Sequence, residues 1–132
     1  MEERDRELYR IAVRMLTKAY APYSGFRVGA ALRTGDGKIY TGVNVENGSY
    51  GAAICAERTA VVKAVSEGSR DFEAIAIASS GGAAMPCGIC RQVLSEFEEG
   101  IRVITGESEE KLEDFRLSEL LPYSFQLDPE RK

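Results

Sequence analysis

Apolar residues near the start of the chain recur three and four positions apart, from Leu8 to Ala19. This spacing places them along one face of an amphipathic helix, which we predict over residues 4–19. Pro22 follows closely and stops the helix, because the residue before a proline avoids helical backbone angles. The pattern therefore predicts that the chain opens with a helix that packs through one apolar face.

The rest of the chain alternates between strand-like and helix-like segments. In chain order these are strands at 26–33 and 38–45 joined by the turn Thr34-Gly35-Asp36-Gly37, a helix at 55–66, a strand at 74–78, a helix at 86–98, a strand at 101–105, an edge strand at 111–116 and a helical turn at 118–121. The order α-β-β-α-β-α-β-β predicts a single α/β domain over residues 1–132. In it, helices pack on a mixed sheet of about five strands.

The composition is that of a folded protein rather than a disordered or fibrous one. The chain has 132 residues, 44% hydrophobic and 29% charged, which is enough to bury a core. Its apolar runs fall short of the roughly 20 residues that a membrane helix needs. The first residues also lack the apolar stretch of a secretory signal. We therefore expect a cytoplasmic protein that does not bind membranes.

Charge and missing residue types exclude several classes of function. A formal net charge of -4 disfavours a protein that grips a nucleic acid polymer through its phosphates. The chain contains no histidine, so mechanisms that pair a serine or cysteine with a histidine base are excluded. Catalysis must therefore use Cys, Glu, Asp, Lys, Tyr or a bound ion.

The three cysteines all fall at the starts of predicted helices, Cys55 at one and Cys87 and Cys90 at the next. The positive end of a helix favours thiolate over thiol. Cys87 and Cys90 are three residues apart, so their sulfurs emerge on one face, and two helices that each follow a strand can bring three thiolates to one edge of the sheet. Three thiolates occupy three corners of a zinc tetrahedron and leave the fourth open, as in catalytic zinc sites.

Two other interpretations of the cysteines stay open on spacing alone. Cys87 and Cys90 can form a redox pair, although Cys55 is then unexplained, and free cysteines are also common in protein cores. Glu57 lies two residues after Cys55, in the first turn of the same helix. It is either a residue that stabilises the helix dipole or a proton shuttle beside a metal-bound water.

Longer stretches match a known family. They are APYSGFRVGAAL at 21–32, GVNVEN at 42–47, CAERTA at 55–60, PCGICRQ at 86–92, and ELLP at 119–122 followed by Phe125. Over residues 8–125 the chain resembles the small, homotetrameric cytidine deaminases that hold zinc with three cysteines. The resemblance implies a three-layer fold, with helices on both faces of a mixed five-stranded sheet.

The resemblance also implies a mechanism. Cys55, Cys87 and Cys90 would hold one Zn²⁺ per subunit, and zinc would make hydroxide from its bound water. The hydroxide attacks C4 of cytosine while Glu57 carries protons to ring N3 and then to the departing amine. The products are uridine and ammonia.

Three thiolates on Zn²⁺ leave the site with a formal charge of -1, which weakens the pull of the metal on water. Donors to the sulfurs withdraw this excess charge. By resemblance, Arg58 and Gln92 are those donors. The alternative for Arg58 is a surface salt bridge.

A nucleoside site is implied by six further residues. By resemblance, Phe26 stacks on the base and the N–H of Ala56 binds the pyrimidine carbonyl. Asn44 and Glu46 bind the ribose 3′-hydroxyl in the same family. Tyr50 and Phe125 resemble residues that reach the site of a neighbouring subunit. Asn44 and Glu46 alternate along a predicted strand, so both point to one face. Alone, Phe26 is typical of a core residue and the polar pair of a strand edge.

The sequence leaves three candidate functions for the protein. The first is deamination of free cytidine and 2′-deoxycytidine in pyrimidine salvage, by a homotetramer with shared active sites. The second is an aminonucleoside deaminase of the blasticidin S type, which shares the cysteine stretches; Asn44, Glu46 and the full CAERTA sequence favour cytidine. The third is a non-catalytic zinc module, which leaves Glu57 without a role.

Overall fold

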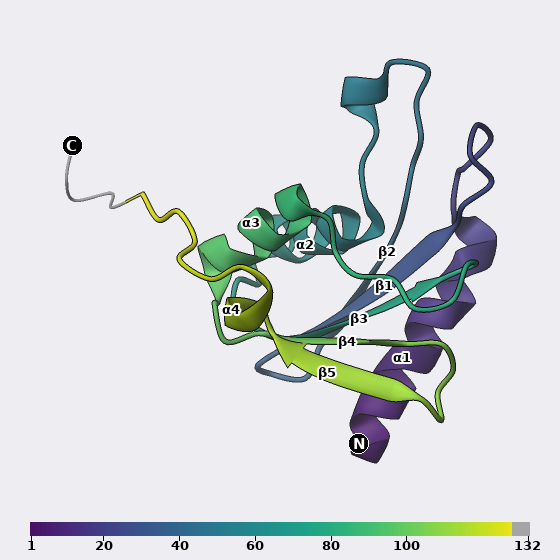
Figure 1. The fold of residues 1–132 in the computed structure, drawn as a ribbon. Helices are drawn as coiled ribbons and strands as arrows, with labels where there is room; N and C mark the ends of the chain where they lie inside the picture. Colours follow the sequence, from purple (N-terminus) through teal and green to yellow (C-terminus); the bar gives the residue numbers. More distant parts are fainter. Residues whose placement is uncertain (128–132) are drawn as a thin grey trace.

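A mixed five-stranded sheet lies between two helical layers in the computed structural model, which describes residues 1–127 (Figure 1). The strands follow the order β2-β1-β3-β4-β5, with β3 and β4 parallel and the other neighbours antiparallel. Their bounds are β1 Val28–Thr34, β2 Ile39–Val43, β3 Phe72–Ser79, β4 Arg102–Gly106 and β5 Leu112–Arg116. The predicted fold class is confirmed, including β5 as an edge strand.

Helices cover both faces of the sheet. In Figure 1, α1 lies on one face while α2 and α3 lie on the other. The helices are α1 Glu3–Met15, α2 Ala56–Ser66, α3 Gly88–Phe97 and the short α4 Leu117–Leu120, with 3₁₀ turns η1 Leu16–Lys18 and η2 Tyr50–Ala52. Within residues 1–127, no helix combines the length and apolarity needed to cross a membrane.

The two faces of the sheet carry side chains of different size. Strand residues alternate between the faces, and those under α1 are mostly alanines, namely Ala31, Ala74, Ala76 and Ala78. Those under α2 and α3 are larger, including Leu32, Ile75, Ile77 and Val103. The alanine face lets a single helix pack closely, whereas the larger side chains fill the core beneath the helical layer that carries the cysteines.

Gly42 sets the distance between α2 and the sheet. A side chain at this position of β2 would collide with the carbonyl oxygen of Ala56, and its Cβ would lie 2.6 Å from the nitrogen of Ala60. Because glycine has no Cβ, the first turn of α2 rests directly on the strand. The start of α2, where Cys55 lies, is thereby held against the sheet.

Most predicted bounds are correct within a few residues, and the differences have local causes. The first helix tightens into η1 before Pro22. Cys87 has an extended backbone and caps α3, so the helix starts at Gly88 rather than at residue 86. β2 ends at Val43, two residues early, because Val45 pairs with Tyr20 and Ile54 rather than with β1. The last five residues of the predicted domain, 128–132, lie outside the described part.

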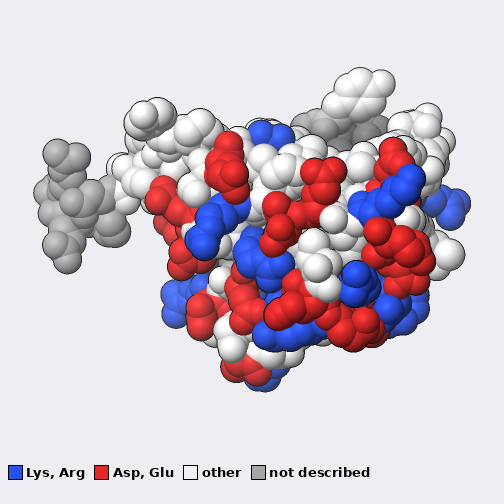
Figure 2. All heavy atoms as spheres, turned by 60° about the horizontal axis from the view of Figure 1, so that its bottom comes forward, with Lys and Arg blue, Asp and Glu red and all other residues white. Residues whose placement is uncertain are grey.

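The α1 side of the sheet carries a network of ion pairs. The buried carboxylate of Asp5 contacts Arg33 at 3.1 Å and Arg102 at 2.9 Å. Arg33 also contacts Glu73 at 2.7 Å, and Arg102 contacts Asp114 at 2.7 Å. The network ties α1 to strands β1, β3, β4 and β5. Figure 2 shows acidic and basic side chains intermixed over the side of the molecule that lies at the bottom of Figure 1.

Candidate active site

The starts of α2 and α3 bring the three cysteines together. Cys55 caps α2, Cys87 caps α3, and Cys90 follows in the first turn of α3. The Sγ atom of Cys87 lies 3.8 Å from that of Cys55 and 3.5 Å from that of Cys90. Tetrahedral zinc with bonds of about 2.3 Å holds its sulfur ligands roughly 3.8 Å apart. The three free thiols therefore have the spacing of zinc ligands.

The cluster supplies three ligands and leaves a position open. In the described part of the chain, the group of potential metal ligands at this point comprises these three sulfurs alone. Structural zinc sites usually have four protein ligands, whereas catalytic sites have three and leave one position for water or substrate. The donor set is thus that of a catalytic zinc site.

Arg58 lies against the sulfurs. Its Nη2 atom donates to Sγ of Cys55 at 3.6 Å, and within residues 1–127 it forms no ion pair with a carboxylate. Interaction with the Cys90 thiol, followed by that with Arg58, lowers the pKa of Cys55 to about 5 against the opposing effect of burial. The guanidinium therefore favours a thiolate at Cys55 before any metal binds.

Glu57 is a buried carboxylic acid beside the cluster. Its side chain is 5% exposed and lines the same pocket as Cys55 and Cys87. Burial raises the pKa of Glu57 to about 7, and the nearby negative charge of Cys55 acts in the same direction. In the metal-free protein the carboxyl group therefore exists in both protonation states near neutral pH.

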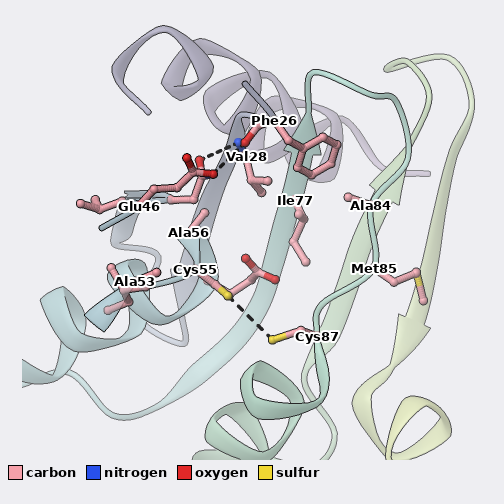
Figure 3. A pocket seen from close by; sticks show the side chains of 14 residues that line it. Phe26, Val28, Glu46, Ala53, Cys55, Ala56, Ile77, Ala84, Met85 and Cys87 are labelled. Carbon is pink, nitrogen blue, oxygen red and sulfur yellow. Dashed lines mark hydrogen bonds between the residues drawn. The ribbon is translucent and has the colours of Figure 1, made fainter. Parts of the chain in front are cut away.

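The pocket is a cavity of about 290 Å³ with chemically distinct ends. Figure 3 shows Cys55 and Cys87 at one end, with Phe26 and Glu46 away from them at the other. The wall between is mostly apolar and includes Val28, Ile77, Ala84 and Met85. A small flat ring with a polar substituent matches such a cavity.

Comparison with known proteins identifies the family. The family model described as "Cytidine and deoxycytidylate deaminase zinc-binding region" matches residues 2–107. The chain belongs to this deaminase family. The matched zinc-binding region and the three-sulfur cluster together make Zn²⁺ the metal of the site.

Relatives of the chain carry the same family name. A cytidine deaminase from Halalkalibacterium halodurans is 46% identical over 92% of this chain and 94% of that protein. The crystal structure of cytidine deaminase from Burkholderia pseudomallei superposes with a TM-score of 0.86 at 43% identity, over 95% of this chain and all of that one. A blasticidin-S deaminase from Bacillus cereus is less similar, with 31% identity over 95% of this chain and 94% of that protein.

Asn44 and Glu46 line the pocket of this family member, but not as successive residues of a strand, since β2 ends before them. Oδ1 of Asn44 accepts the N–H of Val28 at 2.9 Å, and its Nδ2 donates to the carbonyl of Phe26 at 2.8 Å. The hydrogen bond from the Ser24 hydroxyl is the main cause that lowers the pKa of Glu46. Both side chains therefore hold the segment before β1 while they face the pocket.

Gln92 lies differently from the prediction. Its Nε2 atom donates to the carbonyl of Phe125 at 2.9 Å, and no hydrogen bond to a cysteine sulfur is found among residues 1–127. The amide instead anchors the segment after α4 across α3. Tyr50 and Phe125 are 87% and 69% exposed and lie outside the cavity, whereas Ala56 lies in its wall.

Three residues around Phe26 were not apparent from the sequence. Ser24 and Ser80 bind the backbone beside Phe26, and the Phe26 ring lies within 2.9 Å of where a Cβ on Gly81 would stand. Ser80 and Gly81 lie in a loop whose composition predicts only a turn. The contacts depend on where the loop after β3 passes β1, which local sequence does not encode.

Proposed function

We propose that the protein hydrolyses cytidine and 2′-deoxycytidine to uridine and 2′-deoxyuridine, with release of ammonia. The observation that carries the proposal is one cavity that is lined at one end by two of the three clustered sulfurs and a buried acid, and at the other end by an aromatic ring and a carboxylate. The cytidine deaminases at 46% and 43% identity support this choice of substrate.

The cysteine end of the cavity is the metal end. Cys55, Cys87 and Cys90 would hold Zn²⁺, which would supply Lewis-acid activation of a water molecule. Arg58 withdraws negative charge from the three thiolates through its bond to Cys55. The N–H of Ala56 lies in the first turn of α2, where it lacks an intrahelical acceptor, and it donates to the pyrimidine carbonyl.

Glu57 moves the protons. Its carboxylate takes a proton from the attacking water and delivers it to N3 as the C4–O bond forms. It then takes the second proton from the same oxygen and delivers it to the amine as the C4–N bond breaks. Because each transfer restores the starting state of the acid, one buried side chain serves both steps.

The other end of the cavity binds the nucleoside. Phe26, a residue that is 46% exposed, stacks on the base. Glu46 and Asn44 bind the 3′-hydroxyl. The lowered pKa of Glu46 keeps its carboxylate ionised near neutral pH. The ionised carboxylate accepts hydrogen bonds from Tyr23 and Ser24 and retains acceptor capacity for a sugar hydroxyl.

We further propose a homotetramer in which Tyr50 and Phe125 complete the pockets of neighbouring subunits. Both aromatic side chains are largely exposed. They lie on the β2–α2 loop and the C-terminal segment, which extend away from the sheet in Figure 1. Exposed aromatic residues of this size mark interaction surfaces. Sedimentation of the purified protein tests this assembly.

The proposed chemistry supports a role and a location for the enzyme. We propose that it acts in the cytoplasm in pyrimidine salvage, as one deaminase domain over residues 1–132. Three free thiols that must stay reduced to bind metal favour a reducing compartment. A blasticidin S-type activity is the second candidate because of the relative at 31% identity. A non-catalytic zinc module gives no reason to bury Glu57.

The decisive experiment is the loss of ultraviolet absorbance of cytidine with zinc-loaded protein, run beside Glu57→Gln and with blasticidin S as a second substrate. We expect rapid loss with the wild type and a much slower loss with the variant at equal zinc content. Turnover of blasticidin S alone would favour the second candidate. Zinc binding with both substrates unchanged would leave only a zinc module.

A further inference from the structure

The backbone around Phe26 is fully hydrogen-bonded, although Phe26 and Arg27 precede β1. All six polar backbone groups of residues 26–28 form hydrogen bonds, and only Ser24, Asn44 and Ser80 provide the partners. Ser80 makes two of these bonds: its Oγ accepts the N–H of Arg27 at 3.0 Å, and its own N–H donates to the carbonyl of Arg27 at 2.9 Å. The backbone that carries Phe26 therefore cannot shift without breaking several bonds.

The ring of Phe26 rests on a glycine. A Cβ atom built on Gly81 would lie 2.9 Å from Cε1 and 3.6 Å from Cδ1 of the ring. Gly81 does not line the cavity, whereas Phe26 does, so the ring separates this glycine from the cavity. The turn itself is fixed, because Oγ of Ser79 accepts the N–H of Gly81 at 3.2 Å and donates to the carbonyl of Gly82 at 2.6 Å.

We propose that Ser80 and Gly81 are positioning residues. They set how far the Phe26 ring projects into the cavity, and thereby the width of the space that is left for the pyrimidine base. This inference rests on the proposed function, in which Phe26 stacks on that base. Ser80 fixes the backbone and Gly81 supplies a surface without a side chain against which the ring lies. Neither residue touches the substrate.

The size of the effect follows from contact distances. Carbon atoms pack at about 3.5–4.0 Å, so an alanine at position 81 displaces the ring by about 0.6–1.1 Å. The backbone of Phe26 is fixed, and the ring moves toward the cavity because the turn is behind it. Gly81 has an ordinary backbone φ angle, so alanine fits the turn itself. The consequence is a narrower space for the base without a change at the metal.

The test is Gly81→Ala, assayed with cytidine and blasticidin S and checked for zinc content. We expect KM for cytidine to rise by about three- to tenfold, the value of one aromatic stacking contact, with kcat within about twofold. The matched control is Gly100→Ala, where the nearest atom to a Cβ is Oε1 of the exposed Glu98 side chain, at 3.2 Å. It should leave both constants unchanged.

A double-mutant cycle with Phe26→Leu separates a ring contact from a distorted turn. Gly81→Ala should have little further effect when Phe26 is already replaced. An equal effect in both backgrounds, or an unchanged KM in the single variant, would overturn the inference.

If Gly81→Ala does not fold, Ser80→Ala decides the question through a smaller rise in KM at constant kcat and zinc content, and an unchanged KM overturns the inference. A wild type that holds zinc but leaves cytidine unchanged refutes the proposed function, and this inference with it. If the wild type deaminates cytidine, the proposed function holds, and the KM values of the variants alone decide whether the inference about Ser80 and Gly81 is correct.

Discussion

Two buried carboxyl groups on opposite sides of the sheet show how neighbouring side chains determine the pKa of a buried acid. Asp5 is 1% exposed and Glu57 is 5% exposed. Burial acts to raise the pKa of Asp5, but hydrogen bonds from Arg102 and Arg33 outweigh it and lower the pKa. Burial of Glu57 is not offset in this way, and its pKa rises to about 7. Similar burial thus yields a permanent charge at Asp5 and, at Glu57, an acid that titrates near neutral pH.

The difference lies in the elements that surround each group. Asp5 faces strands that carry arginines, and these in turn reach Glu73 and Asp114. Glu57 faces an apolar cavity and the cysteine cluster. Full pairing stabilises the fold, whereas an uncompensated acid at a pocket favours chemistry at the expense of stability. The following predictions sharpen this contrast.

The largest effect is expected for Glu57→Gln. Removing the proton carrier should lower kcat for cytidine by on the order of 10²–10⁴-fold. The midpoint of thermal unfolding should stay the same or rise, because a neutral amide is easier to bury than a carboxyl group that ionises. Calorimetry and cytidine kinetics on zinc-matched samples check both. A variant that loses activity only because it unfolds would contradict the contrast.

Asp5→Asn should behave in the opposite way. Removing one partner from a buried ion network should lower the free energy of unfolding by about 3 kcal/mol, with kcat per folded molecule unchanged. Urea titration measures this loss. The control is Glu7→Gln, because Glu7 pairs with Arg10 at the surface and should contribute less than about 1 kcal/mol. Equal losses in the two variants would refute a special role for Asp5.

Arg58→Gln should weaken the metal site rather than the fold. Loss of the donor to Cys55 should lower the affinity for zinc or kcat by about tenfold, as for other groups that support metal ligands. Competition with a chromogenic chelator measures the affinity. Arg14→Gln, at an exposed arginine on α1, is the matched control. Zinc affinity unchanged in both would remove Arg58 from the metal site.

The smallest expected effect is a dependence of stability on pH. The pKa of Asp5 is lowered from its ordinary value of 3.8, so its contribution is fully present above that value and is lost as the pH falls through the folded pKa. Metal-free wild type should therefore lose its advantage over metal-free Asp5→Asn toward acid. Thermal unfolding at pH 7 and pH 3 checks this. A constant gap would show that Asp5 is not the titrating group.

Much of the fold could be predicted because its information is local. Helical spacing from Leu8 onward and the glycine-rich turn at 34–37 depend on neighbouring residues, and β5 was expected at an edge. The cysteine cluster was also predictable, since each thiol falls at a helix start and α/β packing brings such starts together. For this cluster the structure adds the distances between the sulfur atoms, whereas the residues that form it were already predicted.

Contacts between distant loops could not be predicted in this way. Gln92 was expected near sulfur, but it binds the carbonyl of Phe125, because the segment after α4 crosses α3 at that point. Asn44 was expected to bind the ribose, and local sequence gave no sign that its amide also binds the backbone at Phe26 and Val28. The partners of Asp5 lie 28 and 97 residues away. Such pairings depend on chain paths that no local pattern specifies.

Gly42 has a consequence for how the sequence can change over time. It provides no ligand, proton or substrate contact, yet it seats the helix that follows Cys55 directly on β2. Any side chain at this position would lift α2 and carry one of the three sulfurs away from the other two. Zinc binding therefore constrains a position on the edge strand β2, which supplies no ligand. A mutation of Gly42 would be detected as a lower zinc content of the protein.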